Sequence, residues 1–358
     1  MAPYSNLFLV LGPLLVSIFL LSCQAQAAAI QARAKEPKFL TKSTADLEKK
    51  YKDLKHGPKL KNGPSFVKTN DILWFDNHFA RWDQLFKHYP YDDDRDYLPP
   101  EENPFGGIHP RLKAAPLPGF DAKTNPFSYI ASESPIKGGK GQKTLYWDMI
   151  WANSKEEIVA VSLLESDSDY TQEQVDSLIP SRKGNPISFY AIDNDKGYET
   201  CNVKYTVDYE DGRDYINGDL QYRRVRLRRG DQSRIIHFYH YTEWIFSTSI
   251  STEELQQLID IVNERSKSVP DTPIVVNCLY GLGRTGTFIE AREISNGAQE
   301  AKDNGKNWFS KYASGRTDPI VDYTNRLRQI RDDMIDSSKQ FVFLHQPWAD
   351  AIYKKLYG

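Results

Sequence analysis

Cysteine is scarce in this chain, which has only three among 358 residues, and no Asn-x-Ser/Thr triplet for N-glycans occurs. The three cysteines and seven histidines show no metal-ligand spacing, so the sequence predicts no metal site and no disulfide framework. The formal net charge is only −2, which gives no reason to expect nucleic acid as a partner. Aromatic residues, in contrast, make up 13% of the chain and supply a core for one large domain or two small ones.

The longest apolar run, Leu7 to Leu21, lies near the N-terminus and is followed by Ala25-Gln26-Ala27, a small-residue cleavage pattern. Residues 1–27 therefore predict a secretory signal peptide. We expect a secreted, extracellular protein with no membrane span after this segment is removed. An uncleaved anchor is the alternative, because no Lys or Arg precedes the apolar run, although the run is short for a membrane span.

Residues 28–70 are rich in lysine. Ser43 and Asp46 can cap a short helix whose apolar residues then share one face. We interpret this region as a basic linker with a short helical arm that docks on the main domain, residues 71–358. A basic patch for an acidic partner or a membrane surface is the alternative, although acidic residues dilute the lysines.

One stretch combines a strand, a glycine-rich loop and the start of a helix. Ile274–Val276 are β-branched and predict a buried strand, and Cys278 follows almost at once. Glycines at three positions between 281 and 286 let backbone N–H groups turn inward, and a helix N-terminus adds partial positive charge. Arg284 can hold two phosphate oxygens, and the same positive field favours the thiolate of Cys278. The simpler alternative is a core cysteine beside a connecting turn.

The order of Cys278, five further residues, Arg284 and Thr285 resembles the signature loop of the protein tyrosine phosphatase family. The resemblance implies that Cys278 is the nucleophile, that Arg284 holds the phosphate and the transition state, and that Thr285 belongs to the same catalytic set. It implies no cofactor. The residues expected to bind substrate are Leu279, Tyr280, Gly281, Leu282, Gly283 and Gln340. A disulfide between Cys201 and Cys278 would destroy this loop, so we expect both to remain thiols.

Other stretches resemble the same family and extend the similarity from about Trp74 to Leu356. Tyr129–Pro135 is similar to a family strand and turn, and Tyr146–Trp151 is similar to a family helix. The resemblance implies an α/β (α+β) fold: a single phosphatase-like domain with a twisted mixed sheet and helices on both faces. Periodicity predicts a helix at about 285–294 and an apolar helical stripe from Ile320 to Met334.

Four positions depart from the family's pattern. Leu85 stands where the family has a tyrosine that walls the phosphotyrosine pocket, and Phe246 stands at the aspartate that acts as general acid. Asn277 replaces the histidine before the nucleophile, and Asp336 replaces the glutamine that orients the attacking water. A positioned acid is typically worth about 10²–10⁴ in rate, and a carboxylate at 336 would repel a bound phosphate. Four departures within one mechanism favour a site no longer used for turnover.

Three functional hypotheses follow. The first is a secreted, monomeric pseudophosphatase that binds a phosphorylated protein or another anionic ligand, or acts as an interaction protein. The second is an active tyrosine phosphatase of altered specificity, which would work through a phosphocysteine. The third is a structural extracellular protein with no ligand at the loop. The first is favoured because function depends on the site and not on the fold.

Overall fold

A mixed sheet forms the centre of the fold. The computed structural model describes residues 37–54, 112, 114–120, 128–135, 142–165, 172–192, 199–245, 248–269 and 272–358. The strands are β1 (Ala114–Leu117), β2 (Tyr129–Glu133), β3 (Glu157–Ser162), β4 (Ile187–Ile192), β5 (Glu199–Tyr215), β6 (Leu220–Arg229), β7 (Gln232–Tyr241) and β8 (Ile274–Cys278).

Helices precede, separate and follow these strands. The α-helices are α2 (Thr44–Lys52), α4 (Gln142–Asn153), α5 (Gln172–Asp176), α6 (Thr252–Lys267), α7 (Gly283–Asp303), α8 (Pro319–Ile330), α9 (Ser338–Phe343) and α10 (Asp350–Tyr357). Short 3-10 or π-helical turns are η4 (Ile216–Gly218), η5 (Trp308–Tyr312) and η6 (Leu344–Ala349).

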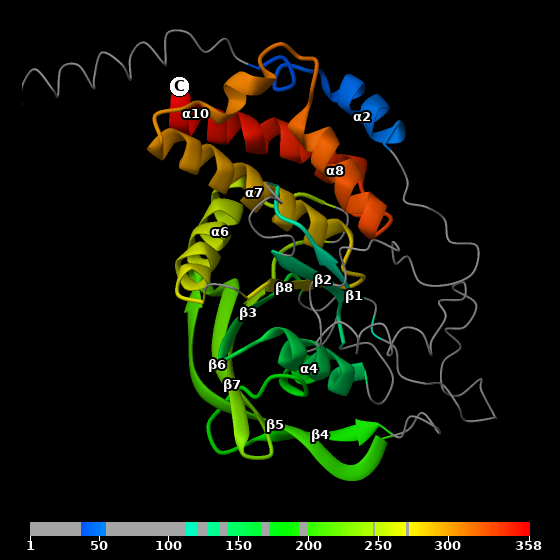
Figure 1. Ribbon diagram of the computed structural model, residues 1–358, viewed down its shortest axis with the longest axis vertical. Coiled ribbons are helices and arrows are strands. Elements are labelled where there is room, and N and C mark those ends of the chain that lie inside the picture. The colour runs from blue at the N-terminus through cyan, green and yellow to red at the C-terminus, as the bar shows by residue number, and fades with distance from the viewer. Residues whose placement is uncertain are drawn as a thin grey trace, which may run out of the picture.

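The strands lie in the order β1-β2-β8-β3-β7-β6-β5-β4 (Figure 1). The four strands β2, β8, β3 and β7 run parallel, and the flanking strands pair antiparallel. All five residues of β8 are buried, as expected for a parallel strand covered on both faces. The carboxyl end of β8 therefore opens at an edge where parallel sheets commonly form ligand sites.

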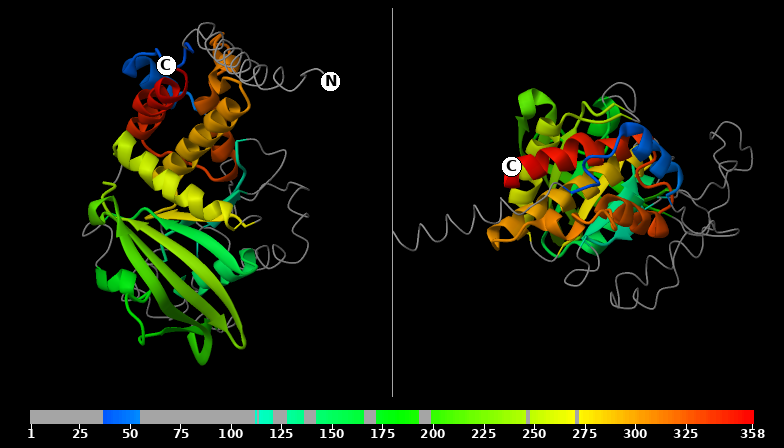
Figure 2. Two further views of the ribbon diagram at one scale, coloured as in Figure 1. Left: turned by 90° about the vertical axis from the view of Figure 1, so that its left-hand side faces the viewer. Right: turned by 90° about the horizontal axis from the view of Figure 1, so that it is seen from above.

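Successive side chains of β8 point into two different apolar layers. Val275 lies with Trp147 in the layer between the sheet and α4. Val276 lies with Phe288 in the layer between the sheet and the helices that follow β7. Figure 2 shows α6 to α10, coloured yellow to red, gathered on one side of the strands. This arrangement confirms the expected α/β (α+β) fold, a mixed sheet with helices on both faces.

Two helices differ from the boundaries predicted above, whereas α6 starts at a capping box that Ser251 and Glu254 form in the sequence. The N-cap Ser251 of α6 accepts a hydrogen bond from the backbone N–H of Glu254 at 3.2 Å. Helix α7 starts before the predicted 285–294 and ends after it. It continues past residue 294 because Ala298 still packs in the core. Helix α8 ends at Ile330, so the prediction that Met334 extends its stripe is wrong: Met334 is buried in the turn that follows.

The N-terminal arm packs beside α8 and α9. The ammonium groups of Lys42 and Lys50 each lie 2.8 Å from Oδ2 of Asp318. The rings of Tyr51 and Phe341 have centroids 5.7 Å apart. The short helix expected in the basic region is therefore α2, and it is docked on the domain.

Several sequence predictions concern residues that the structure describes only in part or not at all. The proposed signal peptide, residues 1–27, lies outside the described residues, as do 28–36 and 55–70 of the linker. Among the residues that the structure describes, no helix is both long enough and apolar enough to cross a bilayer. The thiols of Cys201, which is exposed, and Cys278, which is buried, are both free. Within the same residues, no group of three potential metal ligands occurs.

Candidate functional site

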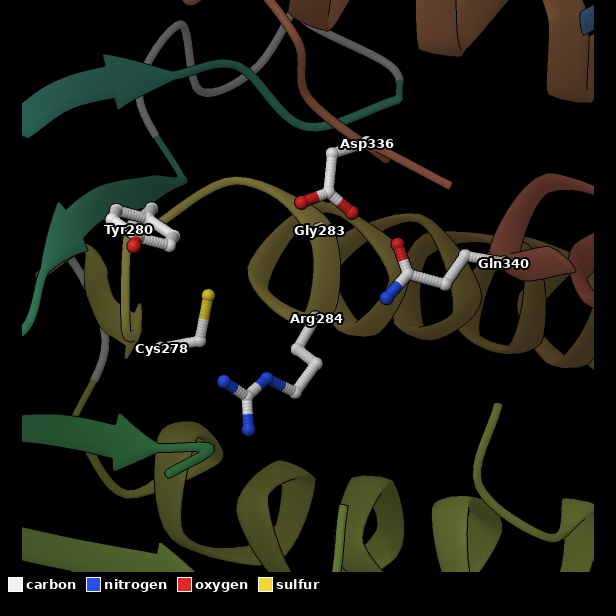
Figure 3. Close-up of a pocket in the computed structure, with 6 residues that line it drawn as sticks. All are labelled: Cys278, Tyr280, Gly283, Arg284, Asp336 and Gln340. Carbon is white, nitrogen blue, oxygen red and sulfur yellow. The ribbon is translucent and has the colours of Figure 1, made fainter. Parts of the chain in front are cut away.

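A small pocket lies at the carboxyl end of β8, between the loop that leads into α7 and the chain around α9 (Figure 3). About 190 Å³ of its space is not filled by atoms, but the gaps are too narrow to hold a water molecule. A phosphate group would enter only if side chains around it moved apart. The residues that line the pocket are Cys278, Tyr280, Gly283, Arg284, Asp336 and Gln340.

The loop that forms one wall is held against its neighbours. Gly281 has a φ of +66°, and a Cβ at this position would collide with the backbone carbonyl of Ser132. Arg331, beyond the end of α8, donates from Nε to the Gly281 carbonyl at 3.0 Å and from Nη2 to the Tyr280 carbonyl at 2.8 Å. Two loop carbonyls are thus bound by Arg331, which does not itself line the pocket.

The cysteine and the arginine of the loop are both buried. Cys278 ends β8 with 3% of its surface exposed, and Arg284 lies in the first turn of α7 with 1% exposed. Nη1 of Arg284 donates to the backbone carbonyl of Trp244 at 2.9 Å, and the Trp244 ring nitrogen donates to the Thr248 carbonyl at 3.0 Å. Arg284 therefore connects α7 to the segment after β7. The start of α7 and the guanidinium both place positive charge beside Cys278.

Two polar side chains form the opposite wall. Gln340 is fully buried, and neither its amide oxygen nor its amide nitrogen has a hydrogen-bond partner among the described residues. The same is true of Oδ1 of Asp336. Asp336 Oδ1 and Gln340 Oε1 both lie close to Gly283. A Cβ added to Gly283 would collide with Asp336 Oδ1 and lie 2.8 Å from Gln340 Oε1. Buried polar atoms without partners are rare, and here they face a pocket.

Burial and neighbouring charges act on the Asp336 carboxyl in opposite directions. Burial raises the pKa of the Asp336 carboxyl above its usual value, and the nearby positive charge of Arg284 offsets this only in part. The negative charge of Asp333 adds to the increase, and Arg328 opposes it. The pocket therefore contains a carboxyl group with a raised pKa beside the loop that carries Cys278.

A strained turn places Asp336. Asp333 and Ile335 have φ values of 60° and 59°, in the left-handed region that is costly for a β-branched residue. Arg328, only 2% exposed, donates from Nε to the Met334 carbonyl and from Nη2 to the Ile335 carbonyl, both at 2.9 Å. Strain of this kind persists only when surrounding contacts hold it, and it clusters at functional sites.

One protein family matches most of this chain. A family model described as "Protein-tyrosine phosphatase" matches residues 88–350. The chain belongs to the protein-tyrosine phosphatase family. The matched segment includes all of the sheet and every residue that lines the pocket.

Individual relatives are distant in sequence. Receptor-type tyrosine-protein phosphatase zeta of Rattus norvegicus is 24% identical over 241 residues, which cover 66% of this chain and 9% of that protein. Receptor-type tyrosine-protein phosphatase R of the same species is 26% identical over 241 residues, 65% of this chain and 30% of that protein. Tyrosine-protein phosphatase non-receptor type 5 of Mus musculus is 25% identical over 237 residues, 63% of this chain and 35% of that protein.

The chain thus matches only 9% to 35% of the length of these curated relatives. A solved structure titled "Structural basis of PTPN18 fingerprint on distinct HER2 tyrosine phosphorylation sites" superposes with a TM-score of 0.46 at 14% sequence identity. That superposition covers 68% of this chain and 73% of the other.

The pocket brings together only part of the set expected from the phosphatase loop. Cys278, Arg284, Tyr280, Gly283 and Gln340 line it. The other predicted members, which do not line it, are Leu279, Gly281, Leu282 and Thr285.

The four residues that do not line the pocket hold the loop in place. Leu279 packs against the apolar layer on the α4 side, and Leu282 packs against the layer on the α7 side. Thr285 is fully buried. Gly281 has a positive φ, a backbone conformation that residues with a side chain rarely adopt. In a loop of this kind the side chains serve as anchors while backbone groups face the ligand.

Of the four positions that depart from the family pattern, the structure describes two. Asn277 is buried, donates to Ser162 Oγ at 3.2 Å and accepts from the Tyr146 hydroxyl at 3.4 Å, so it is tied to the sheet and to α4. Asp336 lines the pocket, and burial raises the pKa of its carboxyl, so its expected repulsion of phosphate stays a prediction. Positions 85 and 246 lie outside the described residues.

Sequence reasoning missed the arginines that support the site. Arg328 and Arg331 were assigned no role, although they hold the turn before Asp336 and the loop after Cys278. The available signal was an arginine within the apolar stripe of a helix, since a buried arginine must find acceptors.

Proposed function

We propose that this chain is a secreted pseudophosphatase of this family, which binds a phosphorylated or otherwise anionic ligand and does not turn it over. The observation that carries this proposal is the pocket where Cys278 and Arg284 meet at the start of α7. Backbone N–H groups of a first helical turn and a guanidinium both favour an anion. In the sequence, Phe246 and Asp336 replace the residues that would deliver a proton and orient water.

Loss of turnover with retention of binding follows from what each group does. Anion binding depends on positive charge and backbone amides, which the loop retains. Proton transfer needs a side chain with a proton to give, and phenylalanine at 246 has none. The ring of Tyr280, 55% exposed, lines the same pocket. Its bulk restricts access, and a ligand must displace it to reach Cys278.

A working phosphatase of altered specificity is the second candidate, and the carboxyl of Asp336 favours it. The Cys278 sulfur would bond to phosphorus while the bond from phosphorus to the leaving oxygen breaks, with the proton for that oxygen supplied by water or the substrate. Water would then attack phosphorus while the P–S bond breaks and returns the Cys278 thiolate, and the Asp336 carboxylate would accept a proton from that water. This scheme predicts a phosphocysteine that forms faster than it breaks down.

Steady-state assays distinguish these candidates. Purified protein is given p-nitrophenyl phosphate and a phosphotyrosine peptide from pH 5 to 8, with Cys278→Ser as the matched control. We expect no release above that of the control. Release that vanishes in Cys278→Ser, or a phosphocysteine trapped for mass spectrometry, contradicts the pseudophosphatase and supports the second candidate.

Calorimetry with tungstate and phosphate tests binding itself. We expect binding by the wild type, tighter binding by Tyr280→Ala because the mouth is wider, and little binding by Arg284→Met. If neither the wild type nor Tyr280→Ala binds an oxyanion, the loop holds no ligand and the chain is a structural or interaction protein.

Secretion is proposed from residues 1–27 alone. Expression of the full chain in a eukaryotic secretory host should release protein into the medium with a new N-terminus after about residue 27. Retention in the membrane fraction with residues 1–27 intact would favour the uncleaved anchor instead.

A further inference from the structure

The pocket contains more hydrogen-bond acceptors than an ordinary anion site requires. Gln340, at 0% exposure, brings its amide oxygen to the same point above Gly283 as Oδ1 of Asp336, and neither oxygen has a donor among the described residues. The amide nitrogen of Gln340 also has no acceptor there. Atoms buried in this way are satisfied by a bound group that both donates and accepts hydrogen bonds.

We propose that the pocket selects oxyanions that carry a proton, a phosphate group with one P–OH, over oxyanions of similar size and charge that carry none, such as sulfate. This inference rests on the proposed anion-binding function and adds the protonation state of its ligand. The P–OH donates to Asp336 Oδ1, and the ionised oxygens accept from Gln340 Nε2, from Arg284 and from the start of α7. Sulfate has no proton to donate near neutral pH, so the Asp336 carboxylate would receive no hydrogen bond from it.

The charges around Asp336 support this selectivity. Arg284 from α7 and Arg328 from α8 face it with positive charge, and Asp333 from the preceding turn faces it with negative charge. Tyr51 from α2 also lies within its electrostatic range, and Cys278 from β8 lines the same pocket. Arg328 already donates to the Met334 and Ile335 carbonyls. A second full negative charge in this setting is therefore poorly balanced unless a proton lies between the two acids.

The bound complex keeps one proton shared between Asp336 and the ligand, whichever of them brings it. Inorganic phosphate still carries a P–OH at neutral pH, whereas a phosphomonoester keeps one only below its second pKa of about 6. Free phosphate should therefore bind at pH 7, and a phosphomonoester should bind more tightly as the pH falls through about 6. Sulfate gains a partner only when Asp336 itself is protonated, so its binding improves only towards acid pH.

Calorimetry on the full chain tests this with two matched pairs: inorganic phosphate against sulfate, and phenyl phosphate against phenyl sulfate, at pH 5.5 and 7. The first pair tests the free anion and the second tests the esterified one. We expect phosphate to bind about tenfold or more tightly than sulfate at pH 7, the size of one hydrogen bond to a charged group. We expect Asp336→Asn to bring the two within about threefold, since its amide donates to either anion.

Asp333→Asn is the matched control, because it removes a neighbouring negative charge from the turn while asparagine tolerates the left-handed backbone. The preference for phosphate should persist in this variant. Equal binding of phosphate and sulfate by the wild type, or a preference unchanged in Asp336→Asn, overturns the inference but leaves anion binding intact. Absence of all binding refutes the proposed function as well. If Asp336→Asn does not fold, the comparison of sulfate with phosphate in the wild type decides alone.

Discussion

Two carboxyl groups flank α8, the buried Asp318 and the half-buried Asp336, and they have different environments. Asp318 caps the start of the helix and accepts hydrogen bonds from Lys42 and Lys50, each at 2.8 Å, and from His345 Nε2 at 3.2 Å. Asp336 lies beyond the end of the helix, and its Oδ1 has no donor among the described residues. Burial acts on both carboxyls in the same direction, so the hydrogen-bond donors and neighbouring charges make the difference.

The pKa values of the two groups follow from those donors. Burial by itself raises the pKa of Asp318, but hydrogen bonds from His345 and the two lysines outweigh it and hold the pKa well below its usual range. Burial raises the pKa of Asp336, and no comparable set of donors opposes it. The carboxylate with many donors is a structural anchor for the N-terminal arm, and the carboxyl without them remains available to a ligand.

The largest effect is expected from Asp318→Ala. The change leaves two lysines and His345 without their shared acceptor and removes the cap of α8, which should lower the free energy of unfolding by about 3 kcal/mol. Urea denaturation measures this, with Asp322→Ala in the first turn of the same helix as the control. A loss equal to that of the control would show that the Asp318 cluster stabilises nothing.

Arg328→Met should have the next largest effect. It removes two hydrogen bonds to buried carbonyls of the strained turn, which should cost about 2 kcal/mol in the free energy of unfolding. The turn should also loosen and no longer present Asp336, so the preference for phosphate over sulfate should shrink. Unfolding by urea and calorimetry check the two parts. A destabilised variant that keeps the full preference would show that the turn does not position the carboxyl.

Asp336→Asn should act in the opposite direction to Asp318→Ala and stabilise the fold slightly. Because the folded pKa lies above the unfolded value, the wild type loses stability as pH rises from the unfolded pKa through the folded pKa. The gain should therefore be absent below about pH 4 and reach at most about 1 kcal/mol at neutral pH, since solvent screens the site. Thermal unfolding at pH 4 and 7.5 tests this. A lower Tm at pH 7.5 would mean that Asp336 is an anchor like Asp318.

The smallest effect is expected from Lys42→Met. Asp318 keeps Lys50 and His345 as partners, and Lys42 is 29% exposed, so the loss should be about 0.5 kcal/mol. Loss of the arm's protection from limited proteolysis is the more sensitive readout, with Lys38→Met as the control. A loss as large as that of Asp318→Ala would show that the first lysine alone secures the arm.

The family resemblance predicted the fold class, and the local pattern of residues predicted where the anion loop lies. The β-branched residues of β8, the glycines after Cys278 and the capping box of α6 are local signals, and each acts within a few residues of the chain. The family resemblance identified Cys278 and Arg284 as residues of one site, and the structure places both in the lining of one pocket.

What faces those two residues depends on contacts between segments that are distant in the sequence. Local periodicity did not show that α8 ends at Ile330, or that a strained turn then brings Asp336 and Gln340 over Gly283. It also did not show that Asp318 is surrounded by donors while Oδ1 of Asp336 has none among the described residues. Burial and hydrogen-bond partners are properties of distant segments brought together, and they set the pKa of a carboxyl more strongly than its identity does.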